Sequence, residues 1–155
     1  MIRMKRALFL LPLVLLGCAL WGVNWRLDHP PPNEADNKFA RLVAGADEVQ
    51  LSPFSRSIKT PVHGAQLAKL RETLRFEDSA GFPTQGYDSY YTLVWKKKGK
   101  VLAQLDTDTG TSPPSLWESG DVPVNFNYRL NPRFGIRFRN LINELVPDVW
   151  QARKR

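Results

Sequence analysis

Residues 89–106 read SYYTLVWKKKGKVLAQLD, and this stretch carries the clearest secondary-structure pattern of the chain. Residues 89–96 are dense in Tyr, Thr, Leu, Val and Trp, and apolar and polar residues alternate again over 101–106. Branched and aromatic side chains favour strands because they pack well on a pleated surface. Between the two stretches, the lysine-rich turn over 97–100 contains Gly99, which suits a tight reversal. The sequence therefore predicts an antiparallel hairpin.

On the C-terminal side of this hairpin, the sequence predicts a loop, a strand and a helix. Residues 107–121 are rich in Gly, Ser, Thr and Pro, which is typical of a loop. Apolar and polar residues then alternate over 122–130, which predicts a half-buried strand, and Pro123 favours a place at a sheet edge. Asn131 and Pro132 are good residues to cap and begin a helix. The apolar stripe of this helix is Phe134, Phe138, Leu141, Ile142 and Leu145.

On the N-terminal side, residues 38–88 predict two helices and one strand. A short helix is expected over 39–43 and a brief strand over 48–51. A second helix is expected to start at Thr60, because the proline that follows loses nothing at the first helical position. Residues 77–88 hold Asp, Ser, Gly and Pro and are expected to form a loop.

Runs of neighbouring strands with helices between them predict an α+β fold. The expected architecture is a two-layer sandwich with a mainly antiparallel sheet of about four strands and two or three helices. Residues 38–155 are expected to form this single domain, and their number is sufficient for one hydrophobic core.

Composition excludes several classes of protein. The chain has 155 residues, one cysteine and a formal charge of +7. A lone cysteine cannot form an internal disulfide, and the length excludes a large multidomain enzyme. Residues 1–6 and 153–155 each carry three basic residues; without these six, 16 basic and 15 acidic residues remain. The positive charge therefore belongs to the chain ends and the hairpin, and we expect no nucleic-acid partner.

The N-terminus has the pattern of a secretory signal peptide over residues 1–17: a basic start followed by an apolar run from Ala7 to Leu16. The sequence Leu15-Leu16-Gly17-Cys18 resembles the lipobox of bacterial lipoproteins, with leucine three places before the cysteine and a small residue just before it. The resemblance implies cleavage before Cys18, acylation of its sulfur, and acylation of the new amine. Several acyl chains, at about 0.8 kcal/mol per buried CH₂, give a stable membrane anchor.

An uncleaved inner-membrane helix over residues 7–25 stays open as an alternative, because these nineteen residues carry no charge and are long enough to span a bilayer. Ala19 occupies the place where aspartate favours inner-membrane retention in enteric-type lipoproteins, so the resemblance favours the outer membrane. Both alternatives place residues 26–155 outside the cytoplasm. Residues 18–37 are expected to be the lipidated N-terminus and an extended tether with three consecutive prolines.

Candidates for catalysis or metal binding are few. Asp108-Thr109-Gly110 matches the aspartic protease triplet, so an envelope hydrolase that uses Asp108 remains an alternative. Asp106 and Asp108 also fit the start of a calcium loop, but its twelfth position is Trp117 where glutamate is needed. The remaining alternative is that both are ordinary turn formers. His29 and His63 have no partner at metal-ligand spacing, and we expect no metal or cofactor.

Candidates for partner binding are more numerous. Large apolar side chains in the two expected loops, 77–88 and 107–121, are typical interface anchors. The hairpin lysines predict a positive patch for an acidic partner, anionic lipid or glycan, or else a solvated turn that prevents edge pairing. The candidate partner-binding residues are Phe82, Tyr87, Lys97, Lys98, Leu116 and Trp117.

These observations favour a membrane-tethered cell-envelope lipoprotein that acts as a non-enzymatic protein-binding module. Small envelope lipoproteins of this kind include inhibitors and immunity proteins against secreted toxins, an analogy to a class. Besides the hydrolase, an accessory subunit of an envelope assembly is the other alternative.

Overall fold

The computed structural model describes residues 2–53, 59–80, 90–108, 113–119 and 126–146. The chain divides into two compact units, residues 1–31 and 32–155. The first unit contains helix α1 (Ile2–Asp28), which includes residues 7–25, the stretch considered above as a spanning helix. Within the described part of the chain, no helix combines the length and the hydropathy needed to cross a membrane.

The stretch expected as a tether, residues 18–37, is largely helical. Helix α1 extends to Asp28 and helix α2 (Glu34–Leu42) begins soon afterwards, so only residues 29–33 of this stretch lie outside helices. Asn33 and Asp36 form a capping box, in which each side chain accepts a hydrogen bond from the other residue's backbone N–H. This reciprocal cap favours a helix start. The three prolines just before it had instead favoured the prediction of an extended chain.

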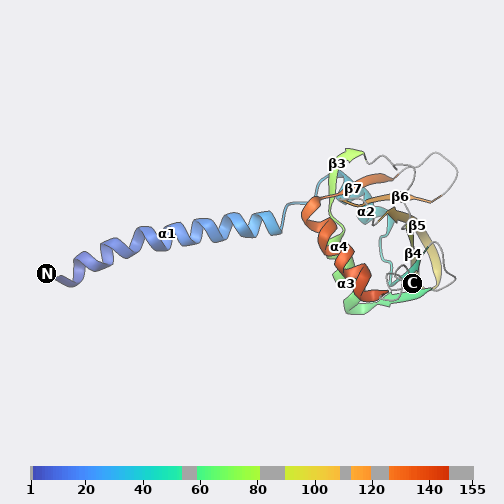
Figure 1. The fold of residues 1–155 in the computed structure, drawn as a ribbon, viewed down its shortest axis with the longest axis horizontal. Helices are drawn as coiled ribbons and strands as arrows, with labels where there is room; N and C mark the ends of the chain where they lie inside the picture. Colours follow the sequence, from blue (N-terminus) through green and yellow to red (C-terminus); the bar gives the residue numbers. More distant parts are fainter. Residues whose placement is uncertain (1, 54–58, 81–89, 109–112, 120–125, 147–155) are drawn as a thin grey trace, which may run out of the picture. The chain divides into compact units, whose positions relative to one another are not determined.

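The second unit has an α+β fold, as the sequence predicts, with one antiparallel sheet. The sheet has seven described strands where about four were expected, in the order β2-β1-β4-β5-β6-β7-β3. Figure 1 labels the part of this order from β4 to β3. The strands are β1 (Glu48–Pro53), β2 (Thr60–His63), β3 (Phe76–Ala80), β4 (Tyr90–Lys97), β5 (Lys100–Asp108), β6 (Ser115–Glu118) and β7 (Asn127–Leu130), and the remaining helices are α3 (Gly64–Thr73) and α4 (Pro132–Leu145).

The core lies between one face of the sheet and helices α2, α3 and α4. Buried and half-buried residues alternate along β1, as expected for a strand with one face in the core. Phe39 of α2, Leu70 of α3 and Phe138 of α4 belong to the same buried cluster as Leu93 and Leu105 of the central strands. All three helices therefore pack on the same sheet face, and α3 and α4 lie side by side (Figure 1).

The predicted hairpin and the C-terminal helix are confirmed. Strands β4 and β5 pair through Lys97 and Lys100, and the two turn residues Lys98 and Gly99 have φ angles of 49° and 77°. Two positive φ values identify a type I′ turn. Helix α4 begins at Pro132, and the side chain of its N-cap residue, Asn131, accepts a hydrogen bond from the backbone.

Three short strands were missed. Residues 60–63 form the edge strand β2, and the expected helix begins only at Gly64; an edge position tolerates the missing N–H of Pro61. Strands β3 and β6 lie where loops were expected, because each is a short segment in or next to a stretch rich in polar residues, Gly and Pro. The described part of the expected strand over 122–130 is β7, which lies between β6 and β3 instead of at an edge; Pro123 lies outside the described residues.

Candidate functional site

The structure separates the candidate partner-binding residues into different environments. Lys97 and Lys98 are exposed at the hairpin turn. Leu116 is fully buried in the core, because β6 is a sheet strand and not a loop, so this residue is not available to a partner. Trp117 is half-buried in the same strand. Phe82 and Tyr87 lie outside the described residues.

The aspartates considered for catalysis belong to β5 and not to a turn. The hydroxyl of Thr92 donates to Asp106 Oδ1 at 2.7 Å across the β4–β5 pair. Asp108 is only 1% exposed. Thr109 and Gly110, the rest of the protease triplet, lie outside the described residues.

The other candidates for chemistry are isolated. His63 is exposed and directly precedes α3. Cys18 is an exposed free thiol in α1. In the described ranges, no three His, Cys, Asp or Glu side chains gather in a way that could hold a metal ion.

A pocket of about 290 Å³ lies between α2 and the end of α3, and we name it the α2–α3 groove. Phe39, Val43 and Leu74 are buried side chains that form its apolar floor. Small residues, among them Ala40 and Gly45, line the α2 side and leave the space open. The groove can therefore accept an apolar group from outside.

Two arginines line the opposite side of the groove. Arg71 Nη2 donates to the carbonyl of Ala46 at 2.7 Å, and its guanidinium carbon lies 5.8 Å from the ring centroid of buried Trp95. The buried Nε of Arg71 has no hydrogen-bond partner among the described residues. Arg75 follows the end of α3, and its side chain is 35% exposed. One guanidinium is therefore fixed at the base of the groove and the other is accessible.

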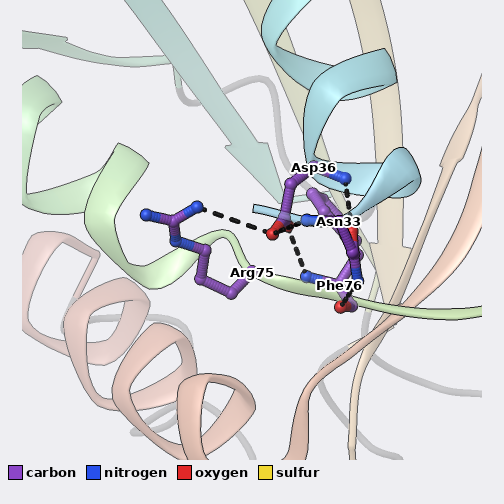
Figure 2. Close-up of polar contacts among 4 residues, drawn as sticks. All are labelled: Asn33, Asp36, Arg75 and Phe76. Atoms are coloured by element: carbon purple, nitrogen blue, oxygen red, sulfur yellow. Dashed lines mark hydrogen bonds and ion pairs between the residues drawn. The ribbon is translucent and has the colours of Figure 1, made fainter. Parts of the chain in front are cut away.

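Asp36 also lines this groove, and it connects α2 to β3 (Figure 2). The backbone N–H of Phe76 donates to Asp36 Oδ1 at 2.9 Å, and Arg75 Nη1 lies 3.5 Å from Oδ2. The side-chain amide of Asn33 donates to the carbonyl of Phe76 at 2.7 Å. These contacts fix the start of α2 against β3, so one wall of the groove is held in place.

The hairpin turn brings a third cation to the groove. A methyl group placed on Gly45, which lines the groove, would lie 2.9 Å from Lys97 Nζ. The ammonium of Lys97 therefore lies beside the groove wall, and the carboxylate of Asp47 accepts hydrogen bonds from the backbone N–H of Lys98 at 2.9 and 3.1 Å. Thus Lys97, a candidate from the sequence, lies beside Gly45 at the edge of the groove, whereas Arg71 and Arg75, which line the groove, were not among the candidates.

A second pocket, of about 330 Å³, lies between α3 and α4. Lys69 and Glu144 face each other across it in an ion pair of 3.1 Å, with both side chains more than half exposed. Its charges balance each other, so it offers less to a charged ligand than the α2–α3 groove does.

Comparisons with known protein families, with characterised proteins and with solved structures found no match for this chain.

Proposed function

We propose that the chain is a lipid-anchored cell-envelope protein that binds a protein partner through the α2–α3 groove and the adjoining hairpin lysines, without catalysing a reaction. The observation that supports binding is the combination of an apolar floor with Arg71, Arg75 and Lys97 beside it. Arginine is enriched in protein-binding hot spots, which cluster in well-packed pockets of an interface.

A protein partner fits the dimensions of the groove better than a cofactor does. Its volume of about 290 Å³ is just below the roughly 300–1,000 Å³ of small-molecule sites. One or two side chains of a partner would fill it. Inhibitors, immunity proteins against secreted toxins and accessory subunits are small envelope lipoproteins that act by such contacts, and we place this chain in that class by analogy.

The anchor is proposed from the lipobox-like sequence that ends at Cys18. Mass spectrometry of the protein in the membrane fraction of bacterial cells tests it. We expect a mature N-terminus at an acylated Cys18, and we expect Cys18→Ala to keep the full precursor length. Detection of intact Met1 in the wild-type protein would contradict the anchor.

Partner binding is tested in the same cells with the full chain. A photo-crosslinking amino acid at position 97, beside the groove, should give a discrete crosslinked protein band. The matched control carries the crosslinker at Lys69, which is exposed on α3 outside the groove. Equal crosslinking at both positions, or at neither, would contradict a partner site at the groove.

A further inference from the structure

We infer that the partner segment bound in the α2–α3 groove presents a side-chain carboxylate next to a large apolar side chain. This inference rests on the proposed function, and it specifies the chemistry of the partner. It follows from three features of the groove: an accessible arginine, a second arginine fixed in place, and an apolar floor between α2 and α3.

Arg75 has hydrogen-bonding capacity to spare. Among the described residues its one ion pair, with the groove-lining Asp36, spans 3.5 Å, and Asp36 already accepts hydrogen bonds from the backbone N–H groups of Asn33 and Phe76. A guanidinium carries five N–H donors in a planar fork that matches a carboxylate. Arg75 can therefore donate to an incoming carboxylate while Asp36 keeps its backbone partners.

Arg71 supplies a fixed positive charge at the base of the groove. The carbonyl of Ala46 and the ring of Trp95 hold its guanidinium, so binding does not have to order this side chain. Its buried Nε lacks a hydrogen-bond partner among the described residues. A carboxylate nearby therefore gains attraction from a charge that is already partly removed from water.

The apolar floor determines the second feature of the ligand, its large apolar side chain. Phe39, Val43 and Leu74 are at most 5% exposed, so only one edge of each is presented to the groove. The volume of about 290 Å³ accommodates one or two side chains such as Phe or Leu but not a whole lipid acyl chain. For this reason we choose a peptide segment over an anionic lipid.

The probe is a set of short fluorescent peptides with a Gly-Ser background and a central Glu-Phe, Gln-Phe or Glu-Ser pair. Binding to the full chain in a neutral detergent is followed by fluorescence anisotropy. We expect Glu-Phe to bind about tenfold more tightly than Gln-Phe, because a hydrogen bond between charged groups is lost in the latter. Glu-Ser should also bind about tenfold more weakly, because no apolar side chain enters the groove.

Variants assign the effect to the groove. Arg75→Gln should remove the preference for Glu-Phe over Gln-Phe, and Ala40→Phe should block binding of both. Arg41→Gln is the matched control, because Arg41 is an exposed cation of α2 that does not line the groove; this variant should retain the preference. Circular dichroism of each variant verifies that the fold is kept.

The outcomes separate this inference from the proposed function. Equal binding of Glu-Phe and Gln-Phe, or an unchanged preference in Arg75→Gln, overturns the inference even when crosslinking at position 97 succeeds. Binding to phosphatidylglycerol vesicles that is lost in Ala40→Phe, with no binding of any peptide, also overturns it and identifies a lipid site. If crosslinking at position 97 fails but Glu-Phe still binds more tightly than Gln-Phe, the proposed role in cells is contradicted. The inferred chemistry of the ligand is then supported.

Discussion

Asp36 should contribute far more to stability than its position in the first turn of a nine-residue helix suggests. Replacing it by Asn keeps the shape but leaves only one acceptor oxygen for two backbone N–H groups, those of Asn33 and Phe76. A buried N–H without an acceptor costs about 1–3 kcal/mol. Loss of the negative charge at the helix N-terminus adds about 0.3–1 kcal/mol. The ion pair with half-exposed Arg75 adds about 1 kcal/mol at most.

We therefore expect Asp36→Asn to lower the free energy of unfolding by about 3 kcal/mol. Urea unfolding followed by tryptophan fluorescence measures it, because Trp95 is fully buried and becomes hydrated on unfolding. Glu34→Gln is the matched control, since it removes the same charge from the same helical turn and should cost about 0.5 kcal/mol. If the two variants differ by less than about 0.5 kcal/mol, the hydrogen bonds of Asp36 do not hold α2 to β3 and the reasoning fails.

Three further substitutions test the packing and the turn, each by the same urea unfolding. Gly135→Ala should destabilise by about 1–3 kcal/mol despite a better helix propensity, because its methyl group would lie 2.8 Å from Pro114 Cδ; an unchanged midpoint would contradict this packing. Lys98→Asn should stabilise by about 1 kcal/mol, because Asn-Gly suits the type I′ turn, and a lower midpoint would argue against that turn. Leu116→Ala should lower the free energy of unfolding by about 2–5 kcal/mol, as expected of a core residue. A decrease near zero would contradict its burial and make it a candidate partner contact again.

Features encoded by neighbouring residues could be predicted from the sequence. The hairpin around Gly99 and the start of α4 at Asn131 and Pro132 depend on signals within a few residues, and both are confirmed. The α+β class follows from the same local patterns. Strand β3 pairs with β7, more than 45 residues further along the chain, and nothing in its own composition indicates that partner. Strand β6 pairs with its neighbours β5 and β7, but it is only four residues long and lies in a stretch rich in Gly, Ser, Thr and Pro.

The candidate site shows the same limit. The lysines at positions 97 and 98 are conspicuous as a charge cluster, so the sequence indicates them. Arg71 was not among the candidates, because periodicity describes one helix at a time. Its contact with the carbonyl of Ala46 joins residues 25 positions apart, and the Asp36–Phe76 contact joins residues 40 apart. A pocket formed by such contacts is invisible to any local pattern.

The two arginines differ in a way that matters for binding. Arg71 is fixed by Ala46 and Trp95, so moving it would disturb the turn after α2 and the core beneath it. The pairing of Arg75 with Asp36 is long and partly exposed, and Asp36 is also satisfied by backbone donors, so little stability depends on where Arg75 points. A carboxylate ligand can therefore recruit Arg75 without loosening α2, and the groove combines a rigid charge with an adjustable one. This difference explains how Asp36 can hold α2 against β3 while Arg75, beside it, stays accessible.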